Sequence, residues 1–265
     1  MYKNILSYLK TINWTKRMEL EIPLLTDFLS SIGSNTSKNK ITVLDLGCGP
    51  GKHLQKLCQI FPDYHFSGVD LSQGMIDYAK DQARQHNYNI SYYANDFLAD
   101  IELNPATFDM IYSLGNSFAL IWGNIPASPK QLIAKVSHHL KPGGILFFQI
   151  LNSDNPRNGY WKSKITKISE TQEVFTLKRF EPDLSTKRMS VEFVSFTRNL
   201  TENSFTHDVK TSSWPLITTD EITTILHKHG FTEVQFWENY RKTPLNPSTG
   251  ESRLCFARKD PKGIL

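Results

Sequence analysis

Cysteine, long apolar runs and blocks of like charge are all scarce in this chain. Its 265 residues contain three cysteines, and their positions 48, 58 and 255 lack the spacing of a metal site. No apolar run is long enough to cross a bilayer, and no secretory signal is recognisable. The net charge of +4 comes from scattered Lys and Arg residues. We therefore expect a cytoplasmic protein with no bound metal that binds neither a membrane nor nucleic acid.

Glycine, by contrast, is concentrated in the run VLDLGCGPG at residues 43–51. Residues 41–46 predict a buried parallel strand, and residues 52–60 predict a helix that follows at once. Between them, Gly47, Gly49 and Gly51 allow a tight turn and a close approach of the backbone to a ligand. The helix that follows would point its free N–H groups at that ligand. The run therefore predicts a binding loop; a turn with no ligand is the alternative.

The glycine spacing, with Asp45 at the strand end, resembles the E/D-x-G-x-G-x-G signature of class I S-adenosylmethionine-dependent methyltransferases. It differs from the G-x-G-x-x-G run of dinucleotide-binding folds, which disfavours a nicotinamide-dependent oxidoreductase. The resemblance implies that S-adenosylmethionine is the cofactor and S-adenosylhomocysteine the product. It assigns cofactor contacts to Asp45, Gly47, Cys48, Gly49 and Gly51, with Cys48 a small filler rather than a nucleophile.

A second predicted strand, residues 64–70, ends in Asp70, about 20 residues after the glycines. At that spacing an acidic residue accepts hydrogen bonds from the ribose hydroxyls of a nucleotide-like ligand. A helix follows at residues 72–86, capped by Ser72. Leu71 and Met75 are expected to flank the adenine ring, which is compatible with ordinary helix–sheet packing.

A third predicted strand, residues 90–94, leads into Asn95, Asp96 and Phe97. A polar side chain there can meet the adenine amino group, and Phe97 can cover the ring face. The pair Asn95 and Asp96 is also a common turn signal. Its place after the third strand favours the cofactor role.

Two further strands are predicted at residues 108–113 and 145–151, with a helix at 128–140 and a break at 141–144. The last two strands are predicted at residues 232–240 and 253–258. This pattern predicts an α/β fold: a doubly wound, Rossmann-like seven-stranded sheet with helices on both faces. Ligands of such sheets lie beyond the carboxyl ends of the strands. Ser113, Leu114 and Gly115 therefore join the predicted cofactor site.

The run LGNSFAL at residues 114–120 resembles the segment after the fourth strand of glycine and glycine/sarcosine N-methyltransferases. Ala94 with Asn95, and residues 152–154 and 160–163, are similar to that group too. The resemblance implies a small-molecule methyl acceptor and favours an amine nitrogen. Leu151 stands where our alignment places that group's carboxylate-binding arginine, so glycine itself is not the expected substrate.

The rest of the chain predicts additions to this core. Residues 1–39 are expected to form an N-terminal helical cap, and residues 155–215 an antiparallel β flap inserted after the fifth strand. The core then comprises residues 40–154 and 216–260. The flap strands are predicted at 173–179, 188–199 and 204–213. Trp14 and Arg17 of the cap are expected to face the cofactor; the alternative is a core tryptophan and a solvated arginine.

Methyl transfer from a sulfonium is an in-line displacement, so aligning the acceptor in a dry site does most of the work. We expect Asn116, Tyr160 and His207 to act in catalysis, and Asn116, Asn152, Tyr160, Arg179 and Tyr240 to bind the acceptor. An O-methyltransferase, whose hydroxyl acceptor needs a general base, stays open. So do a catalytically silent S-adenosylmethionine-binding partner subunit, a macromolecular acceptor and a homo-oligomer.

Overall fold

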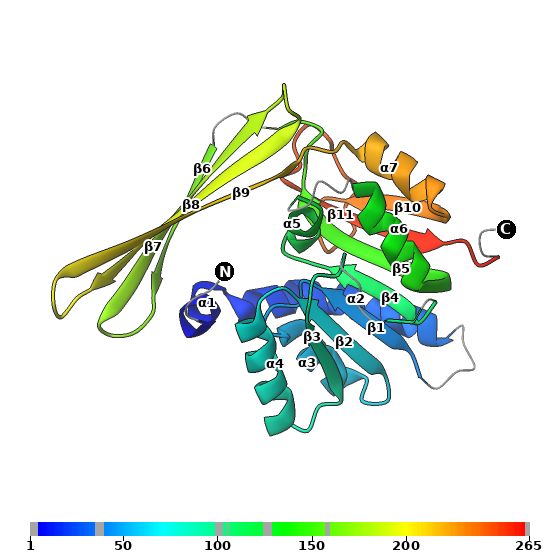
Figure 1. Cartoon of the computed structure of the whole chain (residues 1–265), viewed down its shortest axis with the longest axis horizontal. Coiled ribbons are helices and arrows are strands. Elements are labelled where there is room, and N and C mark those ends of the chain that lie inside the picture. Colours follow the sequence, from blue (N-terminus) through cyan, green and yellow to red (C-terminus); the bar gives the residue numbers. More distant parts are fainter. Residues whose placement is uncertain are drawn as a thin grey trace.

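A mixed seven-stranded sheet forms the centre of the molecule (Figure 1). The computed structural model describes residues 5–34, 40–98, 103–104, 106–123, 129–156 and 160–262. The strand order is β10-β11-β5-β4-β1-β2-β3. The strands are β1 (Thr42–Leu46), β2 (His65–Asp70), β3 (Ile90–Ala94), β4 (Phe108–Ser113), β5 (Leu140–Leu151), β10 (Phe231–Trp237) and β11 (Ser252–Lys259). Strand β11 runs antiparallel to both its neighbours, and the other paired strands run parallel.

Helices cover both faces of this sheet, which confirms the predicted fold. One face packs against α2 (Trp14–Ser34), α3 (Lys52–Ile60) and α4 (Gln73–Gln85). The other packs against α5 (Ser117–Gly123), α6 (Pro129–His139) and α7 (Thr219–Lys228). The amphipathic pattern of each helix explains its place; in α6, Leu132, Ile133 and Val136 are the buried residues that face the sheet.

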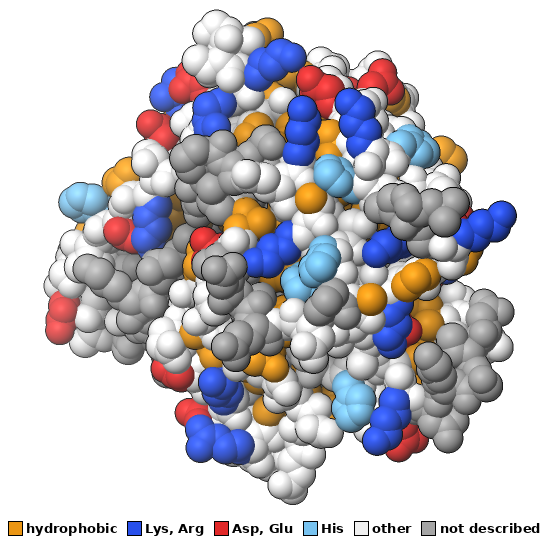
Figure 2. Space-filling view, turned by 45° about the vertical axis from the view of Figure 1, so that its right-hand side comes forward, with side chains coloured by type: hydrophobic (Ala, Val, Ile, Leu, Met, Phe, Trp, Pro, Cys, Tyr) orange, Lys and Arg blue, Asp and Glu red, His pale blue; other side chains and the backbone are white. Residues whose placement is uncertain are grey.

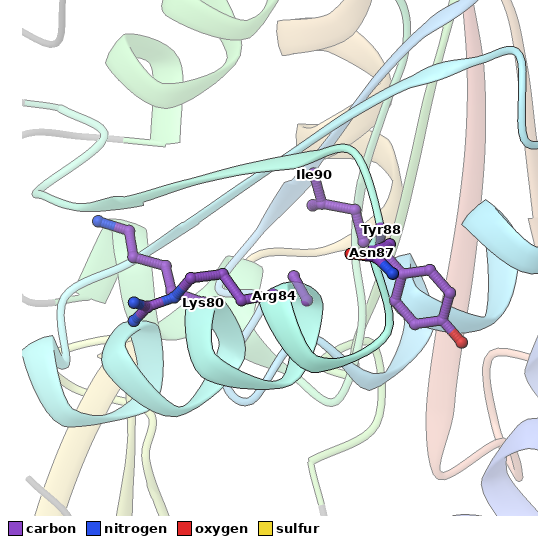
Figure 3. Close-up of a pocket in the computed structure, with 6 residues that line it drawn as sticks. Lys80, Arg84, Asn87, Tyr88 and Ile90 are labelled. Carbon is purple, nitrogen blue, oxygen red and sulfur yellow. The ribbon is translucent and has the colours of Figure 1, made fainter.

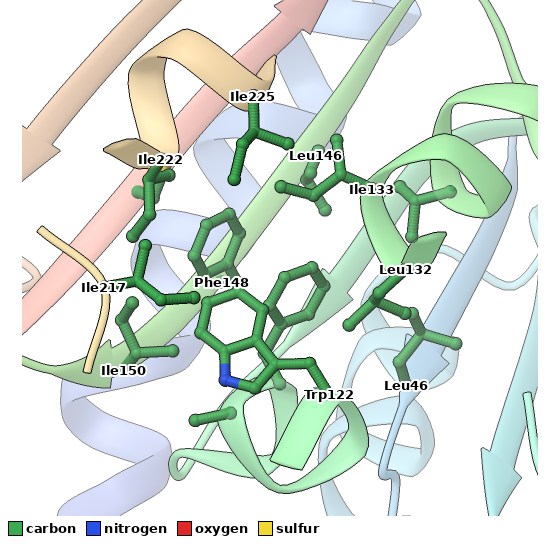
Figure 4. Packing of buried hydrophobic residues seen from close by; sticks show 14 of the residues in the cluster. Leu46, Trp122, Leu132, Ile133, Leu146, Phe148, Ile150, Ile217, Ile222 and Ile225 are labelled. Carbon is green, nitrogen blue, oxygen red and sulfur yellow. The ribbon is translucent and has the colours of Figure 1, made fainter. Parts of the chain in front are cut away.

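The apolar layer between the sheet and helices α5, α6 and α7, here called the aromatic layer, is centred on aromatic side chains (Figure 4). Phe118 of α5 stacks on Phe148 of β5 with ring centroids 4.2 Å apart, and Trp122 meets Phe118 edge-on at 5.2 Å. Offset and edge-on contacts are the favourable arrangements of aromatic rings. Helix α5 is thereby held against the sheet immediately after the end of β4.

The flap is a second sheet of four antiparallel strands in the order β6-β7-β8-β9 (Figure 1). They are β6 (Tyr160–Lys167), β7 (Gln172–Asp183), β8 (Arg188–Asn199) and β9 (Ser204–Pro215). The sequence predicted the last three; β6 was missed because its Lys and Ser residues at 162–164 resemble a polar loop. One end of the sheet packs on α5, and the other projects away from the core.

Two smaller details differ from the prediction. Helix α5 was not predicted, because its seven residues are too short for a clear helical period. Residues 141–144 were expected to end the preceding helix and to separate it from a strand at 145–151, yet they belong to β5. They form an irregularity in the pairing with β4, where Gly143 takes a φ of 76°. The N-terminal helices are α1 (Ile5–Thr11) and α2.

Candidate functional site at the carboxyl ends of the strands

The glycine loop follows β1 and takes a conformation that L side chains disfavour. Gly47, Gly49 and Gly51 have φ values of 74°, 52° and 71°. A Cβ on Gly47 would lie 2.6 Å from Ser117, and one on Gly51 2.3 Å from the Tyr92 hydroxyl oxygen. A Cβ on Gly49 would have no atom within 4 Å. Two glycines are thus required by neighbouring side chains, whereas Gly49 presents its backbone to open space.

Asp70 lies at the end of β2 with its carboxylate held against this loop. Its Oδ2 accepts the N–H of Gly49 at 2.9 Å, and its Oδ1 accepts the N–H of Ser72 at 2.8 Å. Beside it, the side chain of Leu71 is 55% exposed, whereas Met75 is buried. An exposed apolar side chain next to a fixed carboxylate suits a ligand with both a flat apolar part and hydroxyl groups.

Asp45 is buried behind the loop. Burial raises the pKa of this carboxyl to about 8; interaction with the Tyr112 hydroxyl opposes the rise, and the charge of Asp70 adds to it. Burial also raises the pKa of the Cys48 thiol well above its usual range, which disfavours a thiolate nucleophile. Nearby, Ser113 is fully buried and donates its hydroxyl to the carbonyl of Leu46 at 2.6 Å.

Helix α2 brings charged groups to the carboxyl ends of the parallel strands, which are here called the carboxyl edge of the sheet. Arg17 donates to Glu21 through Nε at 2.9 Å and Nη2 at 3.0 Å, and its guanidinium lies 5.3 Å from the Trp14 ring. The Nε2 of His53 in α3 lies 2.5 Å from the Oε2 of Glu21, which also accepts from Nη2 of Arg17. Burial opposes ionisation of Glu21, yet these two partners lower its pKa below the usual value. Arg17 also lies 3.4 Å from the position of a Cβ on Gly115.

The loop after β4 is held by side-chain amides. Asn116 has a φ of 67°, and its Oδ1 accepts the N–H of Leu151 at 3.0 Å. The Oε1 of Gln149 accepts the N–H of Gly115 and the hydroxyl of Tyr240, both at 3.0 Å. The structure thus brings Asn116, Gly115 and Tyr240 together with the end of β5.

Other predicted residues lie elsewhere. Phe97 is buried in the core beside His139, with ring centroids 5.9 Å apart, so it does not cover the candidate site. Asn152 donates both its amide hydrogens, to the carbonyls of Pro247 and Gly250, each at 2.9 Å. Those bonds give Asn152 a structural role because no amide hydrogen is left for a substrate.

Two flap residues also lie away from the edge. Arg179 pairs with Glu181 at 2.7 Å and Glu192 at 3.6 Å, on the face of the flap opposite the buried Phe180. His207 is exposed on that same face of β9. These placements put Arg179 and His207 on the flap face that points away from the core, apart from the residues at the carboxyl ends of the strands. The side chain of Tyr160 lies outside the described part of the structure.

Asn95 and Asp96 follow β3 as expected. The N–H of Asn95 donates to the carbonyl of Asp70 at 3.1 Å, which places the two strand ends side by side. Asp96 accepts the N–H of Leu98 at 2.9 Å, the turn geometry that the sequence also allowed. Leu114 is buried between the glycine loop and α2.

Sequence reasoning missed several residues at or near this edge. Glu21, His53 and Gln149 complete the polar contacts described above. Arg253 of β11 is fully buried and donates to the carbonyl of Ile217 and to the Thr219 hydroxyl, the latter at 3.0 Å. The spacing of four residues between Arg17 and Glu21 was the one available signal, since it predicts a helical ion pair.

A cavity of about 370 Å³ lies at the opposite end of β3 (Figure 3), lined by Lys80, Ala83, Arg84, Asn87, Tyr88 and Ile90. Lys and Arg side chains are interspersed with acidic ones on the face in Figure 2. Among the described residues, no three His, Cys, Asp or Glu side chains lie close enough to hold a metal, and no helix suits a membrane span.

Comparison with known proteins gives the fold and the domain. Residues 43–144 match the family model described as a methyltransferase domain. The malonyl-[acyl-carrier protein] O-methyltransferase of Bacillus anthracis is 31% identical over 144 residues, which are 54% of this chain and 50% of that protein. The chain thus spans about half the length of this curated relative.

Two solved structures extend the likeness to almost the whole chain. An S-adenosylmethionine-dependent methyltransferase from Clostridium acetobutylicum has a TM-score of 0.72 at 19% identity, covering 92% of this chain and 94% of that one. An amino pentose methyltransferase from Micromonospora echinaspora, solved with S-adenosylmethionine bound, has a TM-score of 0.69 at 19% identity, covering 98% of each chain. The chain therefore carries a methyltransferase domain and has the fold of the class I S-adenosylmethionine-dependent methyltransferases.

Proposed function

We propose that this protein uses S-adenosylmethionine to methylate an amine nitrogen of a small molecule. The observation that carries the proposal is the edge where the left-handed glycine loop meets the carboxylate of Asp70. In the sheet, β1 lies between β2 and β4. The edge is therefore at the point where the strand order reverses. Doubly wound sheets bind their ligands at such a point.

The residues of the edge fit the cofactor. Asp70 is fixed by two N–H donors and keeps acceptor capacity for the hydroxyls of a ribose. Leu71 presents an exposed apolar side chain to an adenine, and Gly49 leaves room for the ligand to approach the backbone. Arg17, held by Glu21 beside Gly115, supplies positive charge for the cofactor's carboxylate.

When bound, S-adenosylmethionine supplies a methyl group on a positively charged sulfur, which an acceptor displaces in line. The protein contributes to the reaction by orienting that acceptor. Asn116 suits this role because its amide is fixed by the N–H of Leu151 in a strained backbone conformation. A neutral amine attacks without a general base, so an amide at this position favours nitrogen over oxygen as the acceptor.

The acceptor's class follows from the same region. The run at residues 114–120 supports a likeness to glycine and sarcosine N-methyltransferases in how the acceptor is held. Leu151 cannot bind a carboxylate by paired charged hydrogen bonds as an arginine does. We therefore propose an amine-bearing small molecule other than glycine.

O-methylation is the second candidate. It is favoured by the likeness to the O-methyltransferase of Bacillus anthracis, which covers 54% of the chain. A hydroxyl acceptor requires a base within hydrogen-bond reach of its proton. The position of the new methyl group in the product separates the two candidates.

The test measures S-adenosylhomocysteine release by mass spectrometry after cell extract is divided by ultrafiltration. We expect turnover with the low-mass fraction alone, and a product that is one methyl group heavier with the methyl on nitrogen. Turnover with the retained fraction alone would instead indicate RNA or protein as the acceptor. Cofactor binding without turnover on either fraction would favour a silent partner subunit.

A further inference from the structure

The two faces of the flap sheet differ in what they contact. Phe180, Val191 and Trp214 lie on one face and are buried against the core. Lys164, on the same face, donates to the carbonyl of Thr11 at 2.8 Å. This inner face therefore looks toward α5 and the end of α1. Because side chains alternate along a strand, the residues between them point the opposite way.

The opposite face, here called the outer face, is apolar and exposed. Its apolar residues are Trp161, Ile165, Phe175, Leu177, Val194, Phe196, Phe205 and Val209. Ile165 is 67% exposed, Phe205 63% and Val209 57%. Scattered exposed apolar residues are ordinary, but eight on one sheet face form a contiguous patch. Such a patch is typical of an interaction surface.

The patch has the area of one half of a small stable interface. Over the eight residues of β6, four strands cover about 500 Å², at about 3.3 Å per residue and about 4.8 Å per strand. Two such faces together bury about 1,000 Å², the lower bound of a specific interface. Protruding side chains add to this flat area.

The pattern across the two central strands is self-complementary. In the register of β7 and β8, Arg179 lies opposite Glu192 and Glu173 lies opposite Arg198. Between these charged rows, Leu177 lies opposite Val194 and Phe175 opposite Phe196. A two-fold axis parallel to the strands, midway between β7 and β8, places each β7 residue over the β8 residue of its own row. Arg179 then meets Glu192 of the second copy, Glu173 meets Arg198, and the apolar rows meet each other.

We propose that the outer face is the interface of a symmetric homodimer, in which two flap sheets pack face to face. Sheets packed in this way lie about 10 Å apart and within about 30° of parallel. The symmetry is closed, so the same patch serves both copies and no further copy is added. The inner face, on the other side of the sheet, stays turned toward the core of its own chain.

The first experiment measures molar mass by light scattering at micromolar concentration. The full chain is expected at twice its 30.4 kDa mass. Phe196→Lys, which places an ammonium in the apolar row of each copy, is expected at 30.4 kDa. Ile60→Lys is the matched control, since Ile60 is 39% exposed against 40% for Phe196 and lies at the end of α3. A monomeric wild type, or a Phe196→Lys variant that stays dimeric, would overturn the proposal.

A second experiment tests the charged row by complementation. In a dimer of the Arg179→Glu variant, the introduced carboxylate of one copy would face Glu192 of the other. In a dimer of the Glu192→Arg variant, the introduced guanidinium of one copy would face Arg179 of the other. Each variant alone is expected to be monomeric, and an equimolar mixture is expected to form a dimer, because every facing pair is then of opposite sign. The two side chains are 36% and 44% exposed, so folding is expected to be unaffected, as circular dichroism would verify. A mixture that stays monomeric would contradict the proposed pairing.

Discussion

The carboxyl edge of the central sheet and the flap are stabilised in different ways. At the edge, buried polar groups such as Asp45 and Ser113 lie among fixed backbone donors and acceptors. In the flap, several polar contacts are ion pairs that face solvent; in one of them, the side chain of Arg179 is 36% exposed and that of Glu192 44%. Buried polar contacts depend strongly on geometry, whereas exposed pairs contribute little.

This difference has a consequence for how each part tolerates change. A one-atom addition at Gly51 meets the Tyr92 hydroxyl, so the edge is restricted residue by residue. The flap is held by backbone ladders of up to twelve paired rows, which most side chains can join. The carboxyl edge is therefore the part that tolerates the fewest substitutions, and the flap is the part that tolerates the most.

Leucine truncation gives the largest contrast between the two parts. Leu146 of β5 is fully buried in the aromatic layer, whereas Leu184, in the turn between β7 and β8, is 66% exposed. Leu146→Ala should lower the free energy of unfolding by about 2–5 kcal/mol, since it removes buried methyl groups and leaves a cavity. Leu184→Ala should change it by less than about 0.5 kcal/mol. Chemical denaturation measures both, and similar losses would contradict the contrast.

The pH dependence of stability tests the buried carboxyl of the edge. The pKa of Asp45 is about 8 in the folded chain against an ordinary value of 3.8. Between these values the unfolded chain releases the proton that the folded chain keeps, so stability falls by about 1.4 kcal/mol per pH unit as pH rises. Below about 4 and above about 8 the contribution is constant.

Asp45→Asn removes this group at nearly constant shape. Relative to the wild type, the variant should therefore gain stability steadily from pH 5 to pH 8. Thermal melts of both proteins across this range measure the difference, and the slope matters because any cost of the buried amide is independent of pH. Parallel profiles would show that Asp45 is already ionised in the folded chain.

The edge was predictable from the sequence because its signals are local. The three glycines follow the short apolar strand β1, and their positive φ values explain why glycine is needed there. Asp45 lies near the end of β1, and Asp70 is the last residue of β2. Phe97 was misplaced because an aromatic residue after a strand can turn either to a ligand or to the core. His53 gave no signal, since its partner Glu21 lies 32 residues away on another helix.

The flap was predictable in kind but not in detail. Polar and apolar residues alternate along its strands, but this alternation does not show which face of the flap packs against the core. We assigned Arg179 and His207 to the site because the sequence does not show on which face of the flap they lie. The face was decided by Phe180, Val191 and Trp214, which pack on α5, a helix too short to predict. Long-range packing of this kind leaves no local pattern in the sequence.

Asp70→Ala tests whether the edge binds the cofactor at all. It removes both acceptor oxygens for the ribose, so affinity for S-adenosylhomocysteine should fall about tenfold or more, roughly 1.4 kcal/mol. Asp77→Ala is the matched control, because Asp77 is an exposed carboxylate on α4 that pairs with Gln73. Isothermal titration calorimetry measures both affinities, and melting temperatures establish that both variants fold. Equal affinities in the two variants would exclude Asp70 from the site, whereas a loss confined to Asp70→Ala would identify its carboxylate as a cofactor contact.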